Sequence, residues 1–166
     1  MAIRHVDVQR FSVTSSAPFA DVVAKVDAGI GHTDFPELAR KIGAAGTYAD
    51  VQQLVQAVIG SSELVEFLRL DIGGVLQKAA GPTAPRSLRL IVGNPVTMQK
   101  MASKVPDAAS YAPVTILIDE RADGVHLSYD RMQSFLAPYG DEAALAVARD
   151  LDAHVEALLT SATKGG

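Results

Sequence analysis

Alternation of apolar and polar residues predicts five strands along the chain. In residues 3–14, Val6 and Val8 alternate with polar neighbours before the apolar parity shifts to Phe11 and Val13, which indicates a half-buried strand with a bulge. Four later segments have strand character, at about residues 63–71, 87–92, 114–119 and 125–130. The glycine pair at 73–74 predicts a turn, or a short continuation of the strand, after Asp71.

Apolar residues at helical spacing predict a second set of elements. One helix is capped by Ser16 or Ala17 and has Pro18 in its first turn, another covers about residues 95–105, and a long amphipathic helix closes the chain. Two short helices that begin after Asp34 and Thr47 form a helical insert at about residues 33–60. We therefore expect a single α+β domain over residues 1–166, with a mostly antiparallel sheet, helices against one face and a tail that frays at about 161–166.

Composition narrows the classes of function. The chain is 48% hydrophobic and 20% charged, with a formal net charge of -4. Its basic residues are scattered rather than clustered, which argues against a nucleic-acid partner. The absence of cysteine excludes disulfides and thiolate chemistry within the chain. No signal peptide or apolar run of about 18 residues is present, so we expect a cytoplasmic protein without a membrane partner.

The stretch "IVGNPVTM" contains the first candidate ligand site. Asn94 is a favoured helix N-cap and Pro95 a favoured first helical residue, with Gly93 before them and Thr97 in the first turn. The N–H groups and dipole of such a helix terminus attract anions, although Pro95 removes one donor. The alternative is a well-made helix cap with no ligand.

The strand "VHLSYD" contains the second candidate. His126, Ser128 and Asp130 point to one face of this strand. Alternate residues lie about 6.5–7 Å apart, which is too far for the direct hydrogen bonds of a catalytic triad. These side chains form either a solvated outer face or the wall of a pocket.

Isolated polar residues complete the set of candidates. Asp71 alternates with Arg69 on one strand and forms either a surface ion pair or a polar wall. Tyr111 lies where a loop enters a buried strand, and Lys78 and Arg89 are cations that could meet an anionic ligand. The four histidines fall in separate elements and no nucleotide-binding motif occurs, so we predict no metal and no cofactor.

Several of these motifs together resemble a bacterial family known as domain of unknown function 302. The resemblance covers about residues 62–160 and rests on Asn94-Pro95, on Pro113-Val114 at the start of a strand, and on Ser128-Tyr129-Asp130. It implies a TATA-binding-protein-like order of strand, helix, four strands and helix, and is compatible with a homodimer. Many members have cysteine before Asn-Pro and at the entry to the next strand, where this chain has Gly93 and Ala112 or Pro113. A thiol, metal or redox role therefore does not carry over.

Three functions remain open on these grounds. The first is a small-ligand-binding or accessory protein. Its cleft lies near Gly93–Thr97, takes a small molecule, either anionic or neutral, and has Asp71, Tyr111, Ser128 and Asp130 as walls. The second is an enzyme that uses general acid–base chemistry on His126, Asp130 or Asp71. The third is a homodimeric interaction module with an exposed apolar patch.

Overall fold

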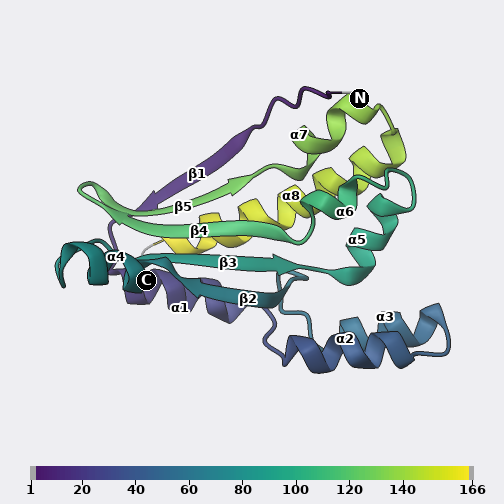
Figure 1. The fold of residues 1–166 in the computed structure, drawn as a ribbon, viewed down its shortest axis with the longest axis horizontal. Helices are drawn as coiled ribbons and strands as arrows, with labels where there is room; N and C mark the ends of the chain where they lie inside the picture. Colours follow the sequence, from purple (N-terminus) through teal and green to yellow (C-terminus); the bar gives the residue numbers. More distant parts are fainter. Residues whose placement is uncertain (1–2, 165–166) are drawn as a thin grey trace.

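A computed structural model describes residues 3–164 and arranges five strands in one open sheet (Figure 1). The strands are β1 (Arg10–Ser15), β2 (Val65–Asp71), β3 (Ser87–Gly93), β4 (Val114–Arg121) and β5 (Gly124–Asp130). Their order in space is β1-β5-β4-β3-β2, and each neighbouring pair is antiparallel. The prediction of an antiparallel α+β sheet is confirmed.

Eight helices accompany the sheet in the described part of the chain. They are α1 (Phe19–Gly29), α2 (Phe35–Ala44), α3 (Tyr48–Gln56), α4 (Ile72–Ala80), α5 (Pro95–Ala102), α6 (Ala108–Tyr111), α7 (Met132–Leu136) and α8 (Glu142–Thr163), with a 3-10 turn at Ala137–Tyr139. In Figure 1, α1 and α8 lie behind the sheet, whereas α5, α6 and α7 gather at one end of it. No helix of residues 3–164 covers the opposite face of the sheet along most of its width (Figure 1), and we call it the uncovered face.

The two faces of the sheet differ because side chains alternate along each strand. On β4, Ile116 and Ile118 are fully buried and face α1 and α8, whereas Leu117 between them is only half-buried. On β5, Leu127 and Tyr129 face the same helices. The register therefore places His126, Ser128 and Asp130 on the uncovered face, together with Arg10, Thr115 and Arg89 from neighbouring strands.

A buried carboxylate joins α8 to the end of β5. Asp152 is 3% exposed, and its carboxylate accepts hydrogen bonds from Tyr129 Oη (2.6 Å), Met132 N (2.7 Å) and Gln133 N (3.1 Å). Burial raises the pKa of Asp152, and the same burial and the nearby carboxylate raise the pKa of Tyr129. Because α7 is only five residues long, this cap from α8 fixes its position.

The structure differs from the predicted pattern at two places. No turn or strand continuation follows Asp71, because helix α4 begins at once. The Asp71 carboxylate accepts a hydrogen bond from Gly74 N (2.8 Å), and Gly81 ends the helix with a φ of 96°. The first strand also begins later than predicted, at Arg10 instead of residue 3, and it pairs with β5 as far as Ser15.

The predicted helical insert corresponds to α2 and α3. Asp34 caps α2, and Thr47 and Asp50 form a reciprocal capping box on α3. The ring of Phe35 stacks on Phe67 of β2, with 4.1 Å between centroids, and this contact ties the insert to the edge of the sheet. At the other terminus, residues 161–163 are not frayed but form the last turn of α8, and residues 165–166 lie outside the described part.

Candidate ligand-binding site

Strands β4 and β5 separate at one end of the sheet. Their register ends at the pair Ile116–Tyr129, whereas β4 continues to pair with β3 through Thr115 and Val114. On the other side, β5 continues to pair with β1 as far as Asp130. We call the opening between Val114–Thr115 and Asp130 the fork. It arises because the chain enters β4 from α6 and leaves β5 into α7, so the two strands diverge (Figure 1).

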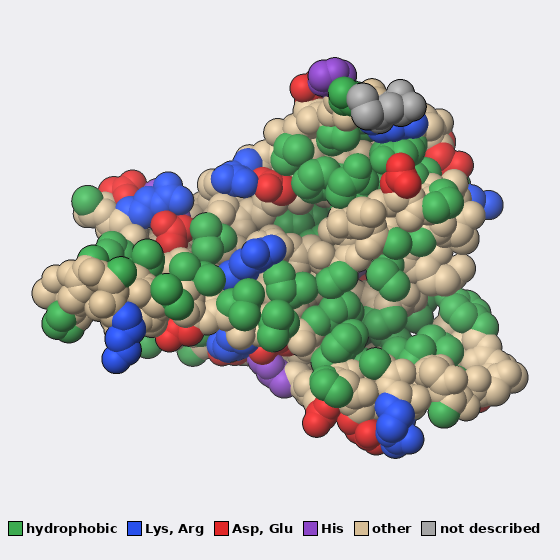
Figure 2. All heavy atoms as spheres, in the orientation of Figure 1, with side chains coloured by type: hydrophobic (Ala, Val, Ile, Leu, Met, Phe, Trp, Pro, Cys, Tyr) green, Lys and Arg blue, Asp and Glu red, His purple; other side chains and the backbone are tan. Residues whose placement is uncertain are grey.

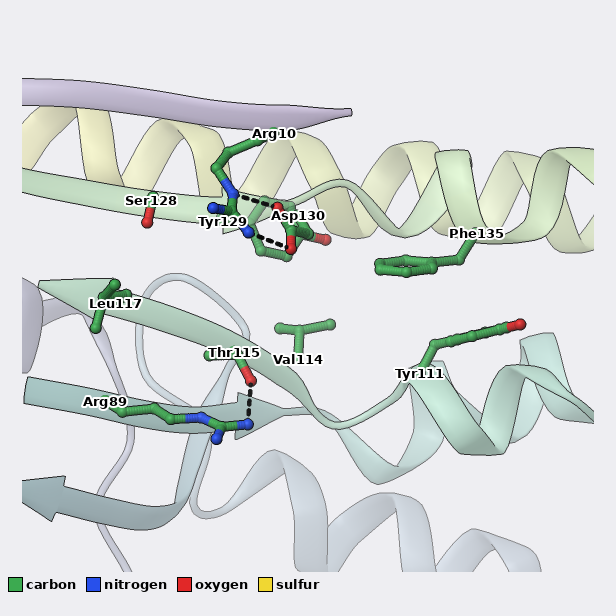
Figure 3. Close-up of a pocket in the computed structure, with 10 residues that line it drawn as sticks. All are labelled: Arg10, Arg89, Tyr111, Val114, Thr115, Leu117, Ser128, Tyr129, Asp130 and Phe135. Atoms are coloured by element: carbon green, nitrogen blue, oxygen red, sulfur yellow. Dashed lines mark hydrogen bonds and ion pairs between the residues drawn. The ribbon is translucent and has the colours of Figure 1, made fainter. Parts of the chain in front are cut away.

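A hollow of about 310 Å³ opens at the fork on the uncovered face. This volume is at the small end of the range for ligand pockets. The floor includes buried parts of Val114 and Tyr129, which become reachable only because the strands diverge. Figure 3 shows the ten residues that line the hollow: Arg10, Arg89, Tyr111, Val114, Thr115, Leu117, Ser128, Tyr129, Asp130 and Phe135.

Two aromatic rings close the hollow at its helical end. Tyr111 of α6 and Phe135 of α7 are stacked, with 4.8 Å between centroids and 17° between planes (Figure 3). The Tyr111 hydroxyl is 3.2 Å from that of Tyr139, which donates to Asp107 at 2.7 Å. These hydrogen bonds raise the pKa of Tyr139. These contacts join the α6 region to α7 and the turn that follows it, beside the fork.

Ser128 supplies a hydroxyl to the hollow. The residue as a whole is 8% exposed, and Figure 3 shows its oxygen pointing from β5 towards β4. Within residues 3–164 this hydroxyl has no hydrogen-bond partner in the protein, and no unpaired side-chain oxygen or nitrogen in this range is sealed from solvent, so the Ser128 oxygen is open to the hollow. It can therefore bond to a molecule in the hollow as donor and as acceptor.

The two arginines at the rim differ in their pairing. Arg10 makes a bidentate ion pair with Asp130, with N–O distances of 2.7 and 2.9 Å, and this carboxylate raises the pKa of Arg10. Arg89 contacts only Thr115 Oγ1, at 3.3 Å, and no described carboxylate lies within ion-pair distance of it. Arg89 is therefore the cation at this rim whose charge is not neutralised.

The structure brings three of the predicted site residues together, since Tyr111, Ser128 and Asp130 all line the hollow. His126 lies on the same face of the sheet but outside this lining. Its Nε2 is 2.8 Å from Asp123 Oδ1 and its Nδ1 is 3.4 Å from Thr14 Oγ1. The histidine lowers the pKa of Asp123, mainly through this hydrogen bond. His126 thus belongs to a surface pair at the opposite end of β5.

The other predicted residues have capping roles. Asn94 Oδ1 accepts from Val96 N (2.9 Å) and Thr97 N (3.2 Å), and Asn94 Nδ2 donates to Glu63 O (3.0 Å). The free donors of the α5 terminus are thereby satisfied, and the enclosed space beside Gly93 is only about 10 Å³. On the other side, Asn94 and Thr97 line a second hollow of about 260 Å³, together with Lys100. Asp71 caps α4, and Arg69 pairs with Glu66 and Asp27 instead of Asp71.

Two properties of the described residues concern metals and membranes. In residues 3–164, no three His, Asp or Glu side chains gather closely enough to coordinate a metal ion. None of the helices in this range has the length and apolar character needed to span a bilayer.

Most of the residues that line the hollow were not predicted from the sequence. Arg10, Thr115, Leu117 and Phe135 were not candidates, and Arg89 was considered only as an isolated cation. For the strand residues among them, the sequence carries one signal: alternation shows on which face of the sheet each side chain lies. Their proximity depends on strand order and register, because β1 and β3 flank the β4–β5 pair from opposite sides.

These features define the class of the molecule as an α+β domain with a five-stranded antiparallel sheet, one helix-covered face and a hollow on the other. Residues 39–162 match the family described as Domain of unknown function DUF302, and the chain belongs to that family, as its motifs predict. No curated protein matches the chain significantly. The fold is similar to the crystal structure of an uncharacterized conserved protein DUF302 from Bacillus stearothermophilus, with a TM-score of 0.63 over 93% of this chain and 98% of that chain. At 10% identity this similarity shows the fold alone.

Proposed function

We propose that the chain binds a small molecule in the hollow at the fork. The observation that carries this proposal is the Ser128 hydroxyl, which is open to the hollow, points into it and has no partner among the described residues. Apolar walls from Leu117, Tyr111 and Phe135 surround it. A mostly apolar concavity with a few polar groups is the usual form of a ligand site. At roughly 30 Å³ of liquid volume per water molecule, the hollow holds a ligand of about ten non-hydrogen atoms.

The geometry favours binding over general acid–base catalysis. A catalytic pair needs two groups within hydrogen-bond reach of each other or of a shared substrate. His126 bonds to Asp123, Asp130 bonds to Arg10, and Asp71 caps a helix, so these three do not converge on one cavity in the described structure. The enzyme hypothesis therefore has less support than a binding role.

The binding proposal can be tested by a fragment screen observed in amide NMR spectra. We expect hits that shift the Ser128 and Thr115 amide signals. Leu117→Trp would fill the hollow from its wall and abolish these shifts. Leu68→Trp is the matched control, because Leu68 is 51% exposed on the edge strand and lies outside the hollow. The proposal fails if no fragment shifts these amides, or if Leu117→Trp leaves the shifts intact.

A second candidate function, a homodimeric interaction module, is favoured by α4. This nine-residue helix buries only Gly73 and leaves Ile72, Val75 and Leu76 at 37%, 67% and 42% exposure. Figure 2 shows hydrophobic side chains gathered along the uncovered face, and α4 projects from its end. A helix this short is marginal alone, so its apolar side chains are suited to a contact.

The second copy of the chain is the partner that suits this surface. Five strands about 4.8 Å apart and about six residues long give a footprint of about 480 Å². Helix α4 adds about 130 Å², and the resulting footprint of about 610 Å² lies at the lower limit of the ~600–1,000 Å² that each partner buries in a standard interface. A two-fold contact brings the same surface of two copies together, so that surface needs charges of both signs. The uncovered face has them in Arg89 and in the Asp119–Arg121 pair.

Sedimentation velocity over a range of concentrations tests the dimer. We expect the wild type to sediment as a dimer and Val75→Glu as a monomer, while Val8→Glu on the N-terminal segment leaves the dimer intact. A monomeric wild type at high concentration would contradict this candidate function.

The finer architecture is also a proposal. We propose that the fold is related to the TATA-binding-protein-like architecture, with α2 and α3 inserted between the first helix and the second strand. The observed order of β1, α1, β2 to β5 and α8 supports this relation. Fold similarity of this kind carries no implication of DNA binding.

A further inference from the structure

We propose that the ligand of the fork is a monocarboxylate with an apolar body, whose carboxylate binds Arg89. The inference rests on the proposed function, because it names the chemical class for the same hollow. Three features support it: the charges at the rim, a row of residues that crosses the strands, and the apolar walls.

The charges at the rim fit one negative charge on the ligand. Three charged side chains line the hollow, namely Arg10, Arg89 and Asp130. Asp130 neutralises Arg10 through two short hydrogen bonds, so Arg89 alone provides an excess positive charge. A guanidinium binds a carboxylate through two parallel N–H···O bonds. A doubly charged phosphate would bring its second charge close to Asp130 without a second free cation.

A single cross-strand row connects the groups that such a ligand needs. Arg89 of β3 is opposite Leu117 of β4, and Leu117 is opposite Ser128 of β5. Neighbouring strands are about 4.8 Å apart, so the row places a cation and a hydroxyl on either side of an apolar residue, across about 10 Å of sheet. All three side chains are on the uncovered face and line the hollow (Figure 3).

Thr115 adds a second contact for the carboxylate. Its hydroxyl is 3.3 Å from Arg89 Nη2 and holds the guanidinium at the rim. The apolar body would then lie over Leu117 towards the stacked rings of Tyr111 and Phe135, which offer no charge. Apolar walls with one unneutralised cation select an amphipathic anion over a neutral or cationic molecule.

Matched eight-carbon probes separate charge from apolar contact. Octanoate, 1-octanol and octylammonium each have eight carbon atoms and about ten non-hydrogen atoms in all, which is the size that the hollow can hold. Amide NMR titration of the full chain should give the tightest dissociation constant for octanoate. Because hydrogen bonds to charged groups contribute about 1.5–3 kcal/mol, we expect octanol to bind about tenfold to a hundredfold more weakly. Octylammonium should bind more weakly still.

Variants of one side chain assign the effect to Arg89. Arg89→Met keeps an apolar stem without the charge, and should weaken octanoate at least about tenfold while leaving octanol unchanged. Arg89→Lys should restore part of the affinity. Arg121→Met is the matched control, because Arg121 lies on the same face, pairs with Asp119 and does not line the hollow. It should change neither constant.

The outcomes distinguish this inference from the function on which it rests. Equal affinity for octanol and octanoate, or an equal loss of both in Arg89→Met, would overturn the carboxylate assignment. So would a fragment screen with hits at Ser128 and Thr115 that include no carboxylates, although the binding function would then stand. The absence of any hit at these amides would overturn both.

Discussion

Substitution of Asp152 tests how the fork is held in place. The Asp152 carboxylate is 3% exposed and binds the Tyr129 hydroxyl and the first two amides of α7. Helix α7 carries Phe135, which is one wall of the hollow. Asp152→Ala therefore removes the cap of α7 and the partner of a buried hydroxyl in a single change.

The magnitude follows from the donors that lose their acceptor. The Tyr129 hydroxyl is buried and loses its acceptor, whereas the buried Met132 amide keeps a second acceptor, Tyr129 Oη at 3.2 Å, and Gln133 is half-buried, so its amide can reach water. One unsatisfied buried donor costs about 1–3 kcal/mol, so Asp152→Ala should lower the free energy of unfolding by about 1–3 kcal/mol. For a domain of this size we expect a fall in Tm of about 2–12 °C. Asp152→Asn keeps one acceptor oxygen and should cost about 1–2 kcal/mol.

Urea unfolding at pH 7, followed by circular dichroism, provides the assay. Asp150→Ala is the control, because Asp150 lies on the same helix, is exposed, and has no hydrogen-bond or ion-pair partner among the described residues. It should change stability by less than about 0.5 kcal/mol. In a double-mutant cycle, Tyr129→Phe and Asp152→Ala should be non-additive. A loss below about 1 kcal/mol for Asp152→Ala would refute the reasoning.

Three further predictions concern other parts of the chain. Gly31→Ala places a Cβ 1.8 Å from a backbone oxygen and should cost more than about 3 kcal/mol in urea unfolding, whereas Gly43→Ala in α2 meets no atom within 4 Å and should stabilise by about 0.5–1 kcal/mol. The ion pair with Arg86 lowers the pKa of Glu120 from 4.5, so the native state binds a proton less readily than the unfolded chain. The stability advantage of wild type over Glu120→Gln should therefore be full above pH 4.5 and disappear as the pH falls through the lowered pKa; an unchanged difference at low pH would contradict this. Phe35→Ala removes a ring stacked at 4.1 Å and should increase hydrogen exchange in α2 and α3 but not in α8; equal protection in both variants would show that other contacts fix the insert.

Strong periodicity explains why most of the fold could be predicted from the sequence. The alternation in β4 and β5 and the caps at Asp34, Thr47 and Asn94 identify elements that the structure confirms. Helix α4 was missed because glycines at 73 and 74 lower helix propensity. The residues that mark its two ends are Asp71, which caps the first turn, and Gly81, which ends the helix with a positive φ.

The candidate site was harder to predict because it forms where strand pairing stops. Nothing in the sequence of β4 or β5 marks Ile116–Tyr129 as the last pair of their register. The direction of each side chain is local information, and Ser128 and Asp130 were identified on that basis. The approach of Arg10 and Arg89 to them depends on the spatial order of four strands, which alternation does not encode.

The stacked rings of Tyr111 and Phe135 shape the hollow but contribute little to the core that stabilises the fold. The rings are only half-buried and lie outside the fully buried core of β4, β5 and α8. Exchange of either ring for a smaller or larger side chain would change the aperture of the fork while the strands beneath keep their register. If the hollow binds a ligand as proposed, changes at these two positions would alter the size of ligand that it takes while the scaffold stays the same.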